Sequence, residues 1–270
     1  MSEKILVDCH NHSWYSSDCD ESVETMCKSA VSREVAVYTI TDHLEIGPDF
    51  KIENFELYKR YANEVRQMSA IYSNNKTQIY LGIELGEASH NIELANQVVE
   101  LDDFDFVIGS LHNLKGYKDF YYLNYDRNNI DFYLTTYFDE LLDIAKWNKF
   151  DVLGHLNYPI RYIVKSGIKE YSLLKYMPKI TEILKTVIAN GKGIEINASG
   201  LRQEIGETMP NFDIIRLYRS LGGEILTIGS DAHKKEDVAK GVDKAIELAK
   251  RAGFDHINYF VKRQPRVIKI

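Results

Sequence analysis

The chain has 270 residues, of which 44% are hydrophobic and 27% are charged, as is typical of a soluble globular protein. Its net charge of −7 argues against a general nucleic-acid-binding protein, because such proteins usually carry a basic excess. The chain begins without the apolar segment of a signal peptide, and no apolar run approaches the roughly 18 residues of a transmembrane helix. We therefore expect no membrane partner.

The three cysteines are Cys9, Cys19 and Cys27, and they form neither a CxxC pair nor an even-numbered framework. This usage indicates reduced thiols and predicts a cytoplasmic protein.

Short β-rich runs alternate with longer helical stretches, which is the pattern of βα units that build a parallel sheet. In chain order, seven strands are expected at residues 4–12, 35–43, 78–87, 104–113, 150–157, 192–200 and 223–233. A length of 270 residues suits one α/β barrel, so we expect a single domain over residues 1–270.

Three helices are expected at residues 127–148, 171–191 and 237–253. Pro178 should either kink the second helix or lie in its first turn, and Gly253 suits the end of the third. The segment 114–126 is aromatic, polar and aperiodic, so it is interpreted as a long loop that can act as a lid.

Each predicted strand ends in side chains that bind metals or protons, and six of the eight histidines are among them. The pairs in chain order are His10 and His12, Asp42 and His43, Glu84 and Glu87, His112 and Asn113, His155 and Asn157, Glu195 and Asn197, and Asp231 and His233. The carboxyl ends of barrel strands converge on one face. A single histidine of this kind is more often a satisfied core residue, but seven such strand ends favour one shared metal site.

Alternation along a strand places His10 and His12 on one face, with Cys9 on the other, and it pairs Asp231 with His233 in the same way. Imidazole and carboxylate ligands suit zinc, manganese or iron, and the lack of cysteine among them disfavours a structural zinc site. The set is too large for one ion, so two or three divalent ions are expected. Such ions lower the pKa of bound water and promote hydrolysis at neutral pH.

Two arginines, Arg161 and Arg202, follow the strand ends at His155 and Asn197 on predicted strand-to-helix loops. A guanidinium group can bind two phosphate oxygens at once. Each arginine alone would be interpreted as a solvated surface residue, whereas the pair on one face favours a phosphate site. The chain has no P-loop and no GxGxxG motif, so a nucleotide-type phosphate site is not expected.

The segments DCHNHSWYSSD, TDH, GIELGE, GSLHN, GHLNY, EINASG and GSDAH, in this order, resemble the motifs of the PHP (polymerase and histidinol phosphatase) family from residue 5 to about 235. The longer segments GHLNYPIRY and EINASGLR resemble its stand-alone histidinol-phosphatase branch. The resemblance implies a distorted, TIM-like (β/α)7 barrel with three metal ions at the carboxyl ends of the strands.

The resemblance also implies which residues bind each ion. The first ion would take His10, His12, Glu84 and Asp231, the second Glu84, His112 and His155, and the third Asp18, His43 and His233. Several relatives have histidine in place of Asp18, so the third site is richer in oxygen ligands here.

The implied activity is hydrolysis of L-histidinol phosphate to L-histidinol and phosphate, in histidine biosynthesis. Arg161 and Arg202 would hold phosphate oxygens, and either Asp231 or His233 would protonate the leaving alkoxide. Asp42 is expected to support the ligands from behind, and Glu87 to receive the cationic end of the substrate at the rim of the site.

Two other functions fit the same residues. One is a different PHP phosphoesterase, either a protein-tyrosine phosphatase or a nuclease, although the acidic charge disfavours the nuclease. The other is a non-catalytic metal-binding barrel, which the complete ligand set disfavours. A small phosphomonoester is therefore the expected partner, and the sequence leaves the oligomeric state open.

Overall fold

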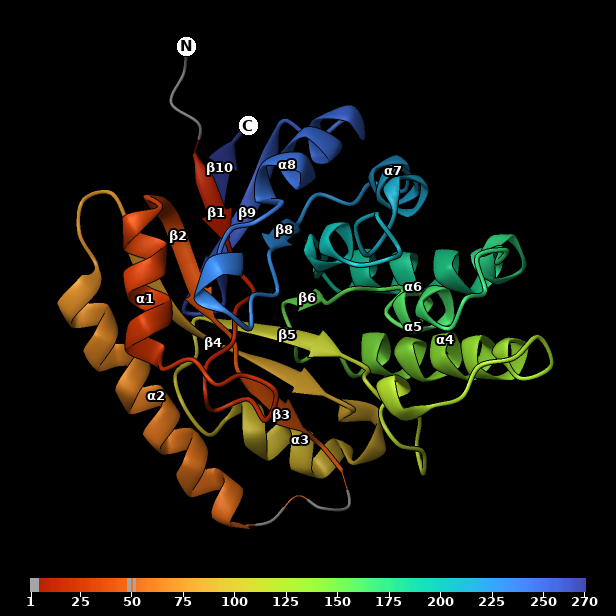
Figure 1. Cartoon of the computed structure of the whole chain (residues 1–270), viewed down its shortest axis with the longest axis horizontal. Helices are drawn as coiled ribbons and strands as arrows, with labels where there is room; N and C mark the ends of the chain where they lie inside the picture. Colours follow the sequence, from red (N-terminus) through yellow and green to blue (C-terminus); the bar gives the residue numbers. More distant parts are fainter. Residues whose placement is uncertain (1–4, 48–49, 51) are drawn as a thin grey trace.

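A parallel sheet that curls into a nearly closed barrel forms the centre of the computed structural model, which describes residues 5–47, 50 and 52–270 (Figure 1). The strands pair in the order β1-β2-β4-β5-β6-β7-β8, and β3 pairs with the end of β4. Their bounds are β1 (Leu6–Asp8), β2 (Val35–Ile40), β3 (His43–Glu45), β4 (Gln78–Gly86), β5 (Phe106–Ser110), β6 (Val152–Leu153), β7 (Gly193–Asn197) and β8 (Leu226–Gly229).

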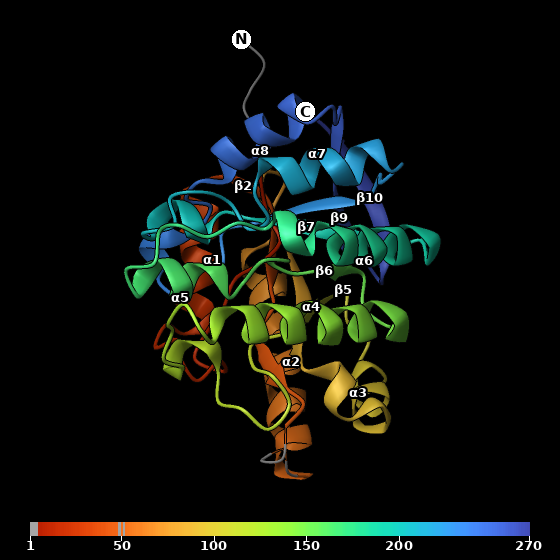
Figure 2. The ribbon, with the colours of Figure 1, turned by 90° about the vertical axis from the view of Figure 1, so that its right-hand side faces the viewer.

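Helices cover the outside of the barrel, and α4 and α6 lie side by side in Figure 2. In α6, for example, Ile180, Ile183, Leu184 and Val187 form a buried apolar stripe at helical spacing. The helices are α1 (Val23–Ser32), α2 (Ile52–Tyr72), α3 (Ile92–Val99), α4 (Ile130–Trp147), α5 (Ile160–Lys165), α6 (Met177–Ala189), α7 (Phe212–Ser220) and α8 (Val242–Arg251). Short 3-10 helices are η1 (Ala88–His90), η2 (Phe120–Tyr122), η3 (Leu174–Tyr176), η4 (Ser199–Arg202) and η5 (Lys235–Asp237).

Backbone hydrogen bonds beyond the ends of β1 and β8 join the first and last strands of the barrel. The amide of Cys9 donates to the carbonyl of Ile228 at 2.8 Å, and the amide of Asp231 donates to the carbonyl of His10 at 2.8 Å. The buried carboxylate of Asp8 accepts hydrogen bonds from the amide and hydroxyl of Ser230, at 2.7 and 2.6 Å. The closure of the barrel therefore sets the segment of His10 directly beside that of Asp231.

The predicted fold class is confirmed, and each of the seven predicted strands contains an observed one that is shorter. His10 and His12 lie beyond β1, and His155 lies in a turn after the two residues of β6. The prediction over 35–43 missed a break, because β2 ends at Ile40 and pairing with β4 resumes only at β3.

The predicted helix over 237–253 begins too early. Ala239 and Gly241 have φ values of 58° and 85°, which interrupt a right-handed helix, so α8 begins at Val242. Pro178 lies in the first turn of α6 and does not kink it.

A C-terminal hairpin of β9 (His256–Val261) and β10 (Gln264–Lys269) was not predicted. Its turn residues, Lys262 and Arg263, have φ values of 51° and 61°, a conformation that Asn-Gly usually signals in a sequence. The hairpin packs against the amino-terminal ends of the strands, where Phe260 stacks on Phe106 with ring centroids 5.1 Å apart.

No helix among the described residues is both long enough and apolar enough to cross a membrane.

The stacking of Phe106 on Phe260 gives a test of the core. Phe106 is 1% exposed, so Phe106→Ala should lower the free energy of unfolding by about 3–5 kcal/mol in urea denaturation. The control Phe132→Ala removes a ring that is 49% exposed and should change it by less than about 1 kcal/mol. Equal losses in the two variants would contradict this packing.

Candidate metal centre

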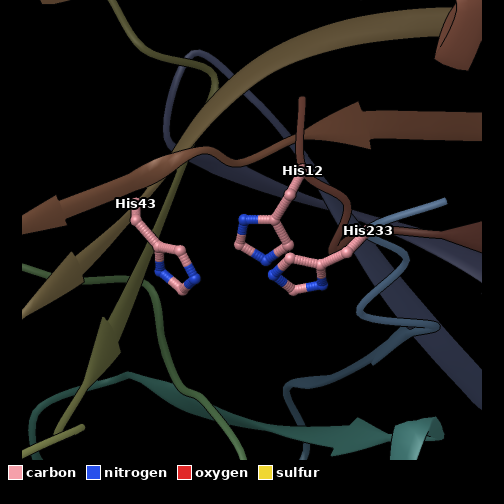
Figure 3. Close-up of side chains that lie close together, drawn as sticks. All are labelled: His12, His43 and His233. Atoms are coloured by element: carbon pink, nitrogen blue, oxygen red, sulfur yellow. The ribbon is translucent and has the colours of Figure 1, made fainter. Parts of the chain in front are cut away.

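Nine side chains, all of types that commonly bind metals in proteins, converge at the carboxyl ends of the barrel strands. We call them the donor cluster: His10, His12, Asp18, His43, Glu84, His112, His155, Asp231 and His233. In Figure 3, the imidazoles of His12, His43 and His233 point toward one another from three separate segments of the chain. The ring centroid of His12 lies 4.3 Å from that of His43 and 4.0 Å from that of His233.

Glu84, on β4, lies at the centre of the donor cluster with its side chain 1% exposed. One carboxylate oxygen, Oε2, is 3.1 Å from His10 Nε2 and 2.9 Å from His43 Nδ1. The other, Oε1, is 3.2 Å from His112 Nε2 and 2.8 Å from His155 Nε2. Burial opposes ionisation of Glu84, but the surrounding imidazoles hold its pKa well below its usual range.

Asp231 connects the last strand to the first two histidines. Its Oδ1 atom lies 3.3 Å from His12 Nε2 and 3.8 Å from His10 Nε2. The other ring nitrogens of these two histidines are hydrogen-bonded. His10 Nδ1 is 2.7 Å from Glu195 Oε1, and His12 Nδ1 is 3.0 Å from Ser16 Oγ. Both Nε2 atoms are thereby directed into the donor cluster.

The residues predicted to bind the third ion, Asp18, His43 and His233, lie at the mouth of the site. Asp18 Oδ2 is 3.1 Å from His233 Nε2, and Asp18 Oδ1 is 3.7 Å from His43 Nε2. Although partial burial opposes it, the close approach of the His233 and His43 imidazoles lowers the pKa of Asp18. With its side chain 58% exposed, Asp18 is the most accessible member of the donor cluster.

Several buried atoms of the donor cluster lack a hydrogen-bond partner among the described residues. They are His10 Nε2, His12 Nε2, His43 Nδ1, Glu84 Oε2, His155 Nδ1 and His233 Nε2. An unsatisfied buried polar atom costs about 1–3 kcal/mol, and a bound cation would satisfy several of these atoms at once. The mixture of imidazole and carboxylate donors fits zinc and similar divalent ions.

In the part of the chain that the structure describes, four groups of three residues have donor atoms within 4.8 Å of one another, which is close enough to share an ion. They are His10, His12 and Asp231; His12, His43 and His233; Glu84, His112 and His155; and His43, Glu45 and His112.

A cavity of about 710 Å³ opens onto the donor cluster, and both predicted phosphate-binding arginines line it. Residues 114–126 supply part of the cavity wall through Asp119, Tyr121 and Tyr122. The cavity is large enough for a small phosphomonoester.

Arg161 lies in the first turn of α5, and not on a loop as predicted. Its guanidinium carbon is 5.0 Å from the ring centroid of Tyr158 and 5.1 Å from that of Tyr162, so the two aromatic rings hold it in place. Its NH1 atom lies 3.8 Å from Asp231 Oδ2.

Arg202 lies at the end of η4, and it fixes the segment that follows β8. Its NH2 group donates to the carbonyl of Asp231 at 3.2 Å, and its NH1 group donates to the carbonyl of Lys240 at 3.3 Å. Asp231 has a φ of 54°, an unusual value for a residue other than glycine, so this hydrogen bond helps to hold its strained backbone.

The expected role of Glu87 at the rim is wrong. Glu87 is 1% exposed, and its carboxylate accepts hydrogen bonds from the amides of His112 and Asn113 at 2.6 and 3.3 Å. It therefore holds the loop after β5, and substrate cannot reach it.

Asp42 is buried, and among the described residues it makes no hydrogen bond to an imidazole. It supports His12 and His43 indirectly, through Ser16. Ser16 Oγ donates to Asp42 at 2.6 Å and accepts from the amide of His43 at 3.0 Å. The expectation that Asp42 supports the ligands from behind thus takes an indirect form.

Two carboxylates that contact the donor cluster were absent from the predicted ligand set. Glu195 was counted among the strand ends, but its contact with His10 was not foreseen. Glu45 is 3.0 Å from His112 Nδ1 and 3.3 Å from His43 Nδ1. Glu45 follows His43 at the same two-residue spacing that identified His10 and His12. That spacing would have revealed Glu45 in the sequence.

Comparisons with known proteins agree with this geometry. Residues 8–199 match the family described as PHP domain. The chain is 27% identical to the probable histidinol-phosphatase of Thermotoga maritima over 93% of this chain and 94% of that protein, and 26% identical to the histidinol-phosphatase of Lactococcus lactis over 94% of each. A crystal structure of the L. lactis histidinol phosphate phosphatase superposes on this chain with a TM-score of 0.81 and 25% identity. The superposition covers 97% of this chain and 98% of that one, and that crystal structure is a complex with zinc, L-histidinol and phosphate.

Zinc should stabilise the folded chain if the donor cluster binds it. Adding zinc to metal-depleted protein at 100 times its dissociation constant should raise the thermal midpoint by about 5–10 °C, as measured by scanning calorimetry. Glu84→Gln removes the central charge and should reduce that shift by more than half. An unchanged midpoint in the unmodified protein, or an equal shift in both proteins, would contradict metal binding at this position.

Proposed function

The chain belongs to the PHP domain family, and on that premise we propose that it is a metal-dependent phosphomonoesterase that hydrolyses L-histidinol phosphate to L-histidinol and phosphate. The observation that supports this most is that two arginines line a cavity whose wall also includes Asp18, His43 and His112 of the donor cluster. The similarity to proteins named histidinol-phosphatase, which extends over more than nine-tenths of the chain, supports the choice of substrate.

We propose that the donor cluster holds two to three divalent ions, zinc, manganese or iron. The ligands would be His10, His12, Glu84 and Asp231 for the first ion, Glu84, His112 and His155 for the second, and Asp18, His43 and His233 for the third. The distances from Glu84 to His10, His112 and His155 and from Asp231 to His12 support the first two groups. Those from Asp18 to His43 and His233 support the third.

When bound, the ions would supply positive charge against the phosphate oxygens and favour ionisation of water at neutral pH. Arg161 would bind the outer phosphate oxygens, since its guanidinium packs against two tyrosine rings at the cavity wall. Arg202 would bind the phosphate from the other side and hold the Asp231 backbone in position.

The leaving alkoxide needs a proton, and we propose Asp231 or His233 as its source. Their side chains lie close together, with Asp231 Oδ1 3.5 Å from His233 Nδ1. The second oxygen of Asp231 is 3.8 Å from Arg161, so a phosphate held by Arg161 would lie next to Asp231.

The whole chain, residues 1–270, is proposed to act as one metallohydrolase domain on a small phosphomonoester. The match to relatives over 93% and 94% of its length supports this. A protein-tyrosine phosphatase or nuclease of the same family is the alternative activity, and a substrate panel distinguishes them.

Purified protein reconstituted with zinc or manganese should release phosphate fastest from L-histidinol phosphate. A tyrosine phosphopeptide and a nucleoside monophosphate serve as the competing substrates, and kcat/KM is compared by phosphate assay. A kcat/KM for histidinol phosphate no higher than for the other two would refute the proposed substrate.

The two arginines should differ in their effects. Arg161→Ala removes a charged phosphate contact and should lower kcat/KM about 10- to 100-fold, mainly through KM. Arg202→Ala also frees the Asp231 backbone, so kcat should fall as well. The control Arg127→Ala removes an arginine whose side chain is 80% exposed, and it should leave both constants unchanged. Unchanged kinetics in Arg161→Ala would remove this residue from the phosphate site.

A further inference from the structure

We infer that Glu45 is a positioning residue, which keeps the ring proton of His112 on Nδ1 and so directs His112 Nε2 into the donor cluster. This inference rests on the proposed metal centre and deepens it, because Glu45 is outside the ligand set described above. Glu45 lies on β3, and its side chain lines the cavity with 43% of its surface exposed.

The two ring nitrogens of His112 have different surroundings. Nε2 is 3.2 Å from Glu84 Oε1 and 3.2 Å from His155 Nε2, whereas Nδ1 is 3.0 Å from Glu45 Oε1. For His112 to bind a cation through Nε2, its proton must lie on Nδ1. The side chain is only 5% exposed, so that proton needs an acceptor within the protein, and the Glu45 carboxylate is in place to accept it.

The pairing of β3 with β4 explains how Glu45 reaches this position. In the parallel register, His43 pairs with Glu84 and Glu45 pairs with Gly86. A Cβ atom at Gly86 would collide with the Glu45 carboxylate, so the absence of a side chain there provides the space that the carboxylate occupies. The register that places His43 against Glu84 therefore also places Glu45 against His112.

Buried Glu87 holds the opposite side of the same arrangement. Its carboxylate accepts a hydrogen bond from the His112 amide at 2.6 Å. Both the backbone and the ring of His112 are thus fixed by carboxylates, one from the segment after β4 and one from β3. Glu45 also lies 3.3 Å from His43 Nδ1, so it contacts two members of the donor cluster.

Two variants of Glu45 separate positioning from direct binding of an ion. Glu45→Ala removes the acceptor, and Glu45→Gln keeps an amide oxygen of nearly the same shape that can accept from Nδ1–H. Zinc affinity is measured by competition with a chelator, and zinc content by elemental analysis at a buffered free zinc concentration. Glu56→Gln, an exposed glutamate that pairs with Lys59, is the control.

We expect Glu45→Ala to weaken zinc binding at one site about 10- to 100-fold, as other losses of a ligand's supporting carboxylate do. Glu45→Gln should stay within about threefold of the unmodified protein. Gly86→Ala, which crowds the carboxylate and leaves its charge intact, should reproduce the effect of Glu45→Ala. Circular dichroism of the metal-free proteins checks that each variant folds.

Kinetics with two substrates add a second readout. If Glu45 acts on His112, Glu45→Ala should lower kcat/KM by the same factor for L-histidinol phosphate and for p-nitrophenyl phosphate, at equal subsaturating zinc. Normal zinc affinity with a higher KM for L-histidinol phosphate alone would overturn the inference, because Glu45 would then bind the substrate. Equal zinc loss in Glu45→Gln and Glu45→Ala would also overturn it, because Glu45 would then be a direct ligand.

These measurements also separate the inference from the proposed function. Unmodified protein that binds zinc but shows no preference for L-histidinol phosphate would refute the proposed substrate, while the zinc affinities of the variants still decide the role of Glu45. Unmodified protein that binds no zinc would refute both.

Discussion

The burial of the Glu84 carboxylate at the centre of the barrel mouth is the constraint on which the rest of the site depends. A buried carboxylate without compensation is strongly unfavourable, and here imidazoles approach both of its oxygens from four other segments of the chain. Attraction between these groups is strong in a low-dielectric interior, but so is the cost of any misplacement. The fold must therefore bring distant segments to one point with little freedom.

Barrel closure provides that accuracy. The backbone hydrogen bonds between Cys9 and Ile228 and between Asp231 and His10 bring the ends of the chain's first and last barrel strands together. Gly229 contributes as well, because a Cβ atom there would collide with the side chains of His10 and Glu195. The first two histidines and Asp231 thus share one site although more than 200 residues separate them in the sequence.

The sequence predicted much of this, because alternation and strand ends are local signals. His10 and His12 follow the two-residue period of an extended chain, and the polar ends of the seven predicted strands identified the converging face. Glu87 was misplaced for a physical reason, because only the folded chain shows that the loop after β5 covers its side chain and donates hydrogen bonds to it. Glu45 was overlooked, although it follows His43 at the two-residue spacing of an extended chain and pairing of β3 with β4 places it beside His112. The C-terminal hairpin was missed because Lys262 and Arg263 adopt positive φ without the usual glycine or asparagine.

If ions held by the donor cluster enable phosphate-ester hydrolysis, activity must depend on bound metal. The most direct test titrates metal-depleted protein with zinc and measures phosphate release from L-histidinol phosphate at each step. We expect negligible activity without metal and a rise to a plateau at two to three equivalents per chain. Full activity in the metal-depleted protein, or a plateau at a single equivalent, would contradict this expectation.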